Sequence, residues 1–270
     1  MFRRVTWLKS HSRLERRMAG DLRRFFQEQA GRLVDRLEDY SGPSPSAVAA
    51  VFDPAEEHRL FMAVAEPHLA EAMGQGALLV QRQTTKAATA ELSPPWDTPF
   101  FQEWWFDIPP GTLARIRLAL TELEEQDYWQ DIQRETADRA TRIISDGVRY
   151  GDSPYKISMT LREELGGYEA RKRALMIART ECAGALNVGH QCEAEDLEEN
   201  GMVIEKVWTS VGDRSVRPSH SAASGQRVRG ARGLFHVGGT SAPYPCHWSL
   251  PARQRVRCRC GVVVEEVAGG

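Results

Sequence analysis

Cysteine and histidine residues near the C-terminal end of the sequence form the set best suited to chemistry. Cys258 and Cys260 flank a single arginine, Cys246 and His247 lie upstream of them, and His220 comes earlier, in a glycine-rich stretch. Thiolate and imidazole are preferred ligands of tetrahedral zinc, and a C-x-C segment in a strand places both thiols on one side. Buried free cysteine is also a common small apolar residue. Two interpretations stay open, a structural zinc site or buried thiols without metal. We expect no cofactor, with structural zinc as the alternative.

Catalytic motifs are missing from the sequence. It contains no phosphate-binding G-x-x-x-x-G-K-[ST], no G-x-G-x-x-G after a strand, no G-x-S-x-G and no H-E-x-x-H. Asp213 and His220 could form an acid–base pair beside Ser219, but such short runs are common in loops. We therefore expect no enzyme. A metal-dependent nuclease or processing enzyme in the segment from Asp213 to Cys260 is the alternative.

Long amphipathic helices must carry these residues. Apolar side chains recur at steps of three and four over residues 12–40, which predicts a helix. Asp53-Pro54 and Ser153-Pro154 each pair an N-cap residue with proline at the first helical position. They predict helices to about Leu79, loosened at its end by Gly74 and Gly76, and to Leu165. Further helices are expected over 112–149 and 169–199. The residues of the first apolar stripe are Leu14, Met18, Leu22, Phe25, Phe26, Leu33 and Leu37.

Arginines cover the other side of that first helix. They form either a solvated face or a contact for an acidic partner or for phosphates of nucleic acid. The second possibility would make the chain a DNA-binding accessory protein, although the net charge of -2 argues against a generally basic surface. The arginines that we expect to make such a contact are Arg16, Arg17, Arg23 and Arg24.

An aromatic segment broken by prolines separates the first helices from the later ones. So many aromatic side chains in a short stretch are costly to leave in water, so the segment either packs on its own domain or anchors another chain. The expected anchors are Trp96, Phe100, Phe101, Trp104 and Trp105.

Composition and length limit the class of protein. The chain has 270 residues, of which 27% are charged and 41% hydrophobic, values that are typical of globular proteins. No apolar run approaches the ~20 residues that span a bilayer, so we expect no membrane partner. Five cysteines, an odd count, and the lack of a signal-peptide pattern favour reduced thiols and assembly in a cytoplasm.

The pattern changes after residue 200, which sets the expected organisation. Val203–Trp208 alternates as a strand does, glycines then punctuate a loop-rich stretch, and Cys258–Val264 is expected to be the closing strand. The fold class is therefore α+β, a mostly helical N-terminal and central body with a small loop-rich mixed C-terminal module. We expect three regions: helices with the aromatic segment (1–110), a long-helix body (111–200) and the β-containing module (201–270).

Separated pieces in a fixed order carry a further signal. Ile177-Ala178-Arg179-Thr180-Glu181 is followed by Asn187, Trp208 and the run Asp213–His220. Gly225, Phe235, Ser249-Leu250-Pro251-Ala252 and Cys258-Arg259-Cys260 come after it. The ordered set resembles the phage Mu F-like family of minor head proteins, over about 106–264 and most tightly over 171–264.

The resemblance implies a minor capsid or head morphogenesis protein. It would be a low-copy structural component of the virion, in the capsid interior or at the portal vertex, acting in procapsid assembly and in DNA packaging or delivery. The portal protein and neighbouring head proteins are the implied partners, packaged DNA is a further candidate, and assembly would occur in the host cytoplasm.

The resemblance also bears on metal. In relatives with a two-cysteine loop, that pair and the closing pair would supply four zinc ligands. Here Arg217 and His220 take the loop positions, so the candidate set is His220, Cys258 and Cys260, with Cys246 or His247 as a fourth.

Polar side chains of the same pieces are expected to hold the module together, because a small loop-rich unit has little apolar core. Arg179 can hold a carboxylate or loop carbonyls, and Asn187 can tie down an irregular loop. Asp213 can cap a turn. The full set of expected structural residues is Arg179, Glu181, Asn187, Trp208, Asp213 and Arg217.

Overall fold

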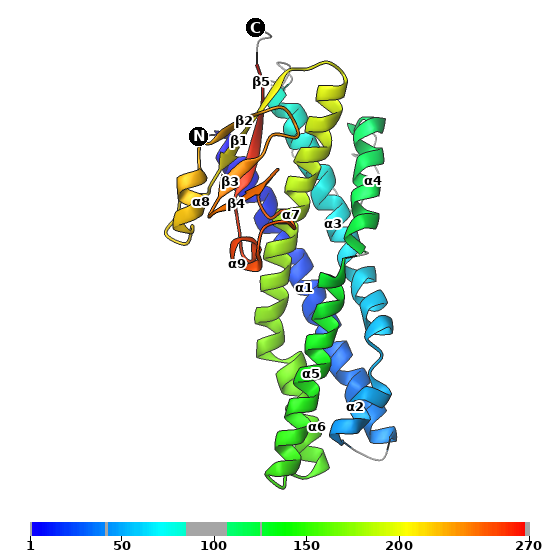
Figure 1. Cartoon of the computed structure of the whole chain (residues 1–270). Helices are drawn as coiled ribbons and strands as arrows, with labels where there is room; N and C mark the ends of the chain where they lie inside the picture. Colours follow the sequence, from blue (N-terminus) through cyan, green and yellow to red (C-terminus); the bar gives the residue numbers. More distant parts are fainter. Residues whose placement is uncertain (1, 41–42, 85–106, 125, 268–270) are drawn as a thin grey trace. The chain divides into compact units, whose positions relative to one another are not determined.

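The computed structural model describes residues 2–40, 43–84, 107–124 and 126–267. Its elements confirm the prediction of a mostly helical α+β protein with a small C-terminal sheet region (Figure 1). The helices are α1 (Phe2–Asp39), α2 (Pro45–Val51), α3 (Pro54–Thr84), α4 (Pro110–Glu124), α5 (Asp127–Arg149), α6 (Pro154–Gly166), α7 (Tyr168–Glu199), α8 (Pro218–Ala223) and α9 (Ala252–Arg255). The strands are β1 (Ile204–Thr209), β2 (Arg227–Arg229), β3 (Phe235–Val237), β4 (Thr240–Ala242) and β5 (Gly261–Glu266).

Contacts within the chain divide it into two compact units. Unit 1 comprises residues 1–15, 68–121 and 177–270, and unit 2 comprises residues 16–67 and 122–176. The division into 1–110, 111–200 and 201–270 remains a prediction. No helix within the described ranges is long and apolar enough to cross a lipid bilayer.

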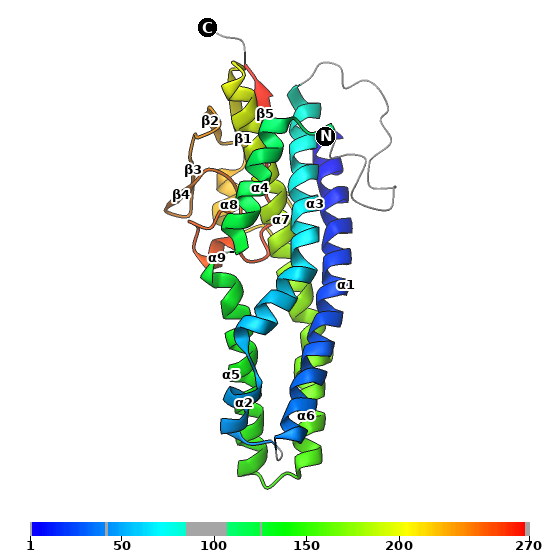
Figure 2. The same cartoon turned by 90° about the vertical axis from the view of Figure 1, so that its right-hand side faces the viewer.

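Unit 2 is a bundle of helices around an aliphatic and aromatic core. All seven side chains of the predicted α1 stripe are buried. Within unit 2, Phe25 contacts Phe61 edge to face with ring centroids 5.4 Å apart, and Phe61 lies 5.7 Å from the buried ring of Trp129. Helices α5 and α6 run side by side, joined by a short turn (Figure 2). A Cβ on Gly147 would lie 2.6 Å from the Ile157 side chain, so the close packing of these two helices requires glycine there.

Helix starts follow the local sequence. Asp53 Oδ1 accepts hydrogen bonds from the backbone N–H groups of Ala55 at 2.9 Å and Glu56 at 3.3 Å. Ser153 Oγ accepts one from Lys156 N at 3.3 Å. Both serve as the expected N-caps and satisfy donors that have no partner within the helix.

Several helix boundaries differ from the prediction. The helix expected over 112–149 is two helices, α4 and α5, with Gln126 in extended conformation between them. Acidic residues concentrate at this point, and negative charge near a helix C-terminus is unfavourable. Helix α3 continues to Thr84, and α2 is an additional helix.

The glycines expected to loosen α3 instead lie within it. A Cβ on Gly76 would lie 2.1 Å from the carbonyl oxygen of Leu186, and one on Gly189 would lie 1.8 Å from that of Met73. Helices α3 and α7 therefore pack backbone to backbone in unit 1, an approach that only glycine permits.

Two small antiparallel sheets complete unit 1. The three-stranded sheet has the order β2-β1-β5, with Glu205 opposite Arg229 and Ile204 opposite Glu266. Strands β3 and β4 form a separate pair. The closing strand starts at Gly261 rather than at Cys258, because Cys258 and Cys260 lie in an irregular segment held by contacts to other elements.

The expected aromatic anchors are outside this description. Trp96, Phe100, Phe101, Trp104 and Trp105 all lie outside the described residues. Their role in contacts with other chains stays a prediction.

Candidate functional site

A buried cluster of one imidazole and two thiols lies in the C-terminal part of unit 1. His220, on α8, places Nδ1 3.5 Å from Cys258 Sγ and 3.4 Å from Cys260 Sγ. The three side chains are at most 2% exposed, and their potential ligand atoms all lie within 4.8 Å of one another. The sequence therefore identified three residues that the fold brings together from two distant segments.

Gln254, on α9, orients the imidazole from its other side. Its Oε1 lies 2.8 Å from His220 Nε2, and Ser219 Oγ donates to the same oxygen at 3.2 Å. An amide oxygen only accepts, so Nε2 carries the proton and Nδ1 presents its lone pair to the thiols. A Cβ at Gly238 would lie 2.1 Å from Gln254 Nε2, so glycine there leaves room for this amide. No sequence pattern pointed to Gln254, because its role depends on where the short α9 packs.

Cys246 joins the cluster from a third segment. It is buried, and its sulfur lies 3.9 Å from the carbonyl oxygen of Arg255 and 4.0 Å from that of Cys258. Donation from the neighbouring Cys246 and Cys260 thiols lowers the pKa of Cys258 well below its usual value, and the proximity of Cys258 together with burial raises the pKa of Cys246. The Cys260 backbone N–H also donates to Cys258 Sγ at 3.4 Å. Cys258 is therefore the preferred thiolate of the three.

His247 takes part in different contacts. Its Nδ1 is 2.7 Å from Ser249 Oγ, and its ring lies edge-on to Tyr244 with centroids 4.9 Å apart. Burial lowers its pKa to about 4. Of the two candidates for a fourth member, Cys246 and not His247 contacts the cluster.

Helix α7 fastens the cysteine segment to unit 1. Asn187 Nδ2 donates to the carbonyl oxygen of Cys260 at 3.1 Å and to that of Ala183 at 2.8 Å. Thr180 Oγ1 accepts from the backbone N–H of Arg257 at 3.0 Å. These contacts hold the irregular segment on both sides of Cys258, and the Asn187 contact is of the kind that the sequence suggested.

Charged residues of the same motif lie around this segment. Arg179 pairs with the buried carboxylate of Glu15 at 2.8 Å, and Glu181, also buried, is close enough to Cys246 to help raise its pKa. Asp213 pairs with Arg259, the residue between the two closing cysteines, at 2.7 Å.

Two more motif residues border the cluster. Arg217 donates to the carbonyl oxygen of Val256. Trp208 is fully buried, and its ring lies edge-on to His220 with centroids 5.7 Å apart. It shields the imidazole from water, as a core side chain would.

The acid–base pair considered from the sequence is not formed. One ring nitrogen of His220 contacts Gln254 and the other contacts the thiols, while the Asp213 carboxylate contacts Arg259. Within the part of the chain that the structure describes, both ring nitrogens of His220 thus contact the cluster and Gln254 rather than a carboxylate, the partner that a catalytic base of this type needs.

A buried lysine was missed by the sequence analysis. Lys206 Nζ donates to Gln191 Oε1 at 3.0 Å and to the carbonyl oxygen of Pro243 at 2.8 Å, and burial lowers its pKa to about 8. Period-two alternation places it on the same face of β1 as Ile204 and Trp208, both buried. That alternation was the available signal.

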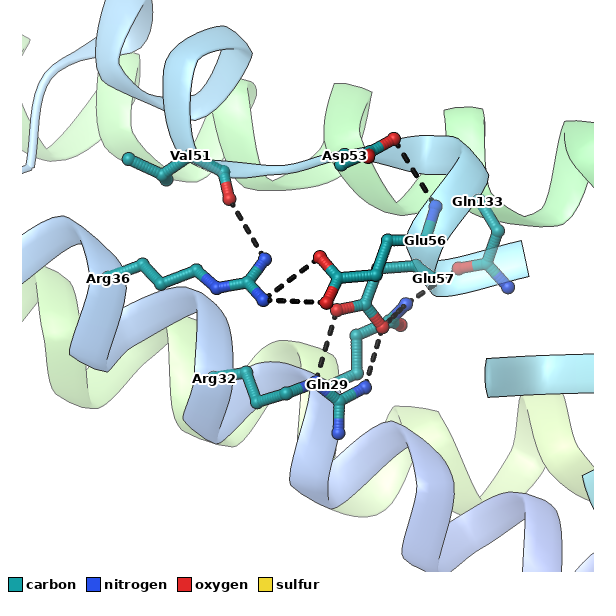
Figure 3. A network of polar contacts seen from close by, with 8 residues as sticks. All are labelled: Gln29, Arg32, Arg36, Val51, Asp53, Glu56, Glu57 and Gln133. Carbon is teal, nitrogen blue, oxygen red and sulfur yellow. Dashed lines mark hydrogen bonds and ion pairs between the residues drawn. The ribbon is translucent and has the colours of Figure 1, made fainter. Parts of the chain in front are cut away.

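The arginine face of α1 in unit 2 has two kinds of members. Arg32 binds the buried carboxylate of Glu57, and Arg36 binds Glu56, so these two contact α3 rather than solvent or a partner (Figure 3). The expected contact residues Arg16, Arg17, Arg23 and Arg24 are exposed, with Arg24 paired to Asp21 on the same helix.

Exposed apolar side chains gather where α5 and α6 meet. Tyr150 and Tyr155 are each 75% exposed, and Val148 and Met159 are more than half exposed. We call these four residues the α5–α6 tip. Glycine and proline punctuation marks the turn in the sequence, but periodicity did not show that its aromatic residues face water.

Comparison with known proteins supplies the class. Residues 138–263 match the family model described as Phage Mu protein F like protein, from within α5 to within β5. No curated protein and no solved structure gave a significant match. The matched region carries the α5–α6 tip, the α7 motif and the His/Cys cluster, and it identifies a phage protein connected, at family level, with head morphogenesis. The match supports a phage Mu F-like protein and indicates, at family level, a component of the virion.

Proposed function

We propose that this chain is a low-copy minor capsid protein at or near the portal vertex. It acts there in procapsid assembly and in the packaging or delivery of DNA, through contacts with the portal protein and neighbouring head proteins. The family match over residues 138–263 carries the proposal. The chain contributes by binding other proteins and catalyses no reaction.

The α5–α6 tip supports a role in protein contacts. Grouped exposed apolar side chains are unusual on a protein that stays alone, and tyrosine is enriched among residues that dominate interface energies. Tyr150 and Tyr155 stand on either side of one turn, on a unit whose own core is filled by other aromatic residues. The tip is therefore a ready contact for a neighbouring head protein.

The exposed arginines of α1 support packaged DNA or an acidic protein surface as a further partner. Replacing Arg16, Arg17, Arg23 and Arg24 by glutamine should preserve folding, since exposed substitutions usually cost within ~0.5 kcal/mol. Incorporation into heads should fall, more steeply at higher salt, because screening weakens exposed charge contacts. Normal incorporation of this variant would remove the arginines from the proposal.

The test is to locate and count the chain in assembled heads of the phage that encodes it. Cryo-electron microscopy and quantitative mass spectrometry should show few copies, at the portal vertex. The variant Tyr150→Ser/Tyr155→Ser should be soluble, helical and depleted from heads by more than tenfold, because buried aromatic anchors each contribute ~2 kcal/mol or more.

A matched control removes two exposed leucines elsewhere. Leu118 and Leu234 are each more than half exposed, so Leu118→Ser/Leu234→Ser removes a comparable apolar surface. It should enter heads at the wild-type level. Heads that assemble and package normally without the chain, or a chain distributed over the whole capsid, would contradict the proposal.

A further inference from the structure

We infer that His220, Cys246, Cys258 and Cys260 bind one structural zinc ion. The inference does not rest on the proposed function. Its first support is the spacing of the ligand atoms. Tetrahedral zinc with Zn–S of ~2.3 Å and Zn–N of ~2.05 Å places nitrogen and sulfur ligands about 3.6 Å apart. The observed separations from His220 Nδ1 are 3.4 and 3.5 Å, in a site closed to solvent.

The second support is the orientation of the imidazole. Zinc-binding histidines use an unprotonated nitrogen and donate the other N–H to an oxygen. Gln254 Oε1 accepts from His220 Nε2 at 2.8 Å, which leaves Nδ1 free to coordinate and aims it between Cys258 and Cys260.

The third support is the local backbone. Among the described residues, the non-glycine residues with positive φ are Cys246 at 66° and Arg257 at 59°. One belongs to the cluster and the other directly precedes Cys258. Such conformations are strained for residues other than glycine and persist where the surroundings enforce them. Metal–thiolate bonds on both sides of the ion would enforce both.

Cys246 supplies the fourth ligand. It is buried, and its sulfur lies 4.0 Å from the carbonyl oxygen of Cys258. The ligand atoms of His220, Cys258 and Cys260 lie within 4.8 Å of one another, and a shift of Cys246 Sγ toward them would complete a set of three sulfurs and one nitrogen, a composition typical of structural zinc. Four protein ligands leave no position for water, so the ion would stabilise the module and would not activate a substrate.

The experiment uses the full-length chain, purified under reducing conditions. Elemental analysis of the purified chain should find about one zinc per chain. After the metal is removed, titration with cobalt(II) should give thiolate-to-cobalt charge-transfer bands. Added zinc should raise the thermal midpoint of the metal-free protein, because an ion that binds only the folded state stabilises it.

Variants distinguish the four-ligand site from other arrangements. Cys258→Ser and His220→Asn should lose stoichiometric zinc, and Cys246→Ser should lose about a third of the charge-transfer absorbance, since one of three thiolates is removed. Cys192→Ser is the matched control, because Cys192 is a buried cysteine of unit 1 outside the cluster, and it should bind zinc as the wild type does.

Wild-type measurements alone can overturn the inference, whatever the variants do. A reduced wild-type chain that holds no zinc and takes up no cobalt would refute it. Cys258→Ser with wild-type zinc content would refute it as well, and full absorbance in Cys246→Ser would remove the fourth ligand.

Discussion

Two neighbouring glutamates on α3 allow a direct measurement of what burial does to an ion pair. Glu57 binds Arg32 and Glu56 binds Arg36, both on α1 within unit 2 (Figure 3). The side chain of Glu57 is 2% exposed, whereas that of Glu56 is 37% exposed. Glu57→Gln and Glu56→Gln therefore make the same chemical change in two environments.

The structure around Glu57 sets the expected magnitude. Its carboxylate accepts from Arg32 Nη2 at 2.6 Å and Nε at 3.1 Å, and from Gln29 Nε2 at 3.1 Å. Gln29 in turn donates to Gln133 Oε1 at 2.6 Å, which ties α5 into the network. A glutamine at position 57 would turn an N–H group toward these donors.

Breaking a buried ion pair by removing one partner costs about 3–5 kcal/mol. Arg32 is partly hydrated, with a side chain 29% exposed, so we expect a somewhat smaller loss, about 2–4 kcal/mol, for Glu57→Gln. Glu56→Gln should cost about 0–1 kcal/mol, the range for exposed pairs.

Native-state hydrogen exchange is the appropriate assay, because a chain with two units need not unfold in one step. Amides of α1 and α3 within unit 2 should show the loss, and a double-mutant cycle with Arg32→Met should give a coupling of about 1 kcal/mol or more. If Glu57→Gln lowers the free energy of unfolding no more than Glu56→Gln does, the cost of burying the Glu57 charge offsets the stabilisation from its ion pair and hydrogen bonds. That result would refute the reasoning.

Two further predictions concern α7. Gly189→Ala should destabilise unit 1 by about 1–3 kcal/mol, because the new Cβ would lie 1.8 Å from the Met73 carbonyl oxygen. Gly184→Ala is the control: its Cβ would lie 3.7 Å from Cys246, so it should be neutral or stabilising by up to about 1 kcal/mol. Equal urea midpoints for the two variants would argue against close packing of α3 on α7. Burial lowers the pKa of His190 to about 3 from 6.5, so unfolding takes up a proton and stability falls as pH drops below 6.5. His190 should contribute about 2 kcal/mol of the loss from pH 7 to pH 5, and the loss in His190→Gln should be smaller by that amount; identical pH profiles would count against it.

Local signals predicted much of the helical framework. The N-caps Asp53 and Ser153 act through neighbouring backbone groups, so sequence was enough to find them. The strand at Ile204–Thr209 followed from alternation. The α4–α5 break and the glycine contacts of α3 were not predictable in this way. Glycine is a poor helix former, so Gly76 alone predicts a loosened helix end. In the fold, the close approach of α7 requires glycine at this position within α3.

In the candidate site too, some residues could be identified from the sequence, whereas others acquire their role only in the fold. Residue type singled out His220, Cys258 and Cys260, because few side chains bind metal well. Gln254 and Lys206 acquire their roles only from distant segments that meet in the fold. The choice between Cys246 and His247 likewise required the structure, since they are adjacent in sequence and differ in where their side chains lie.

The order of strands in the three-stranded sheet has a consequence for synthesis on the ribosome. Strand β1 pairs on one side with β2, which follows closely in the sequence, and on the other with β5, about sixty residues later. At about 5–20 residues per second, the ribosome needs roughly 3–12 s to synthesise the chain from β1 to β5, the second partner of β1. During this interval one edge of β1 can pair with strands of other nascent chains. Translation speed between residues 209 and 261, or a chaperone bound over that interval, would therefore influence how much of the chain folds correctly.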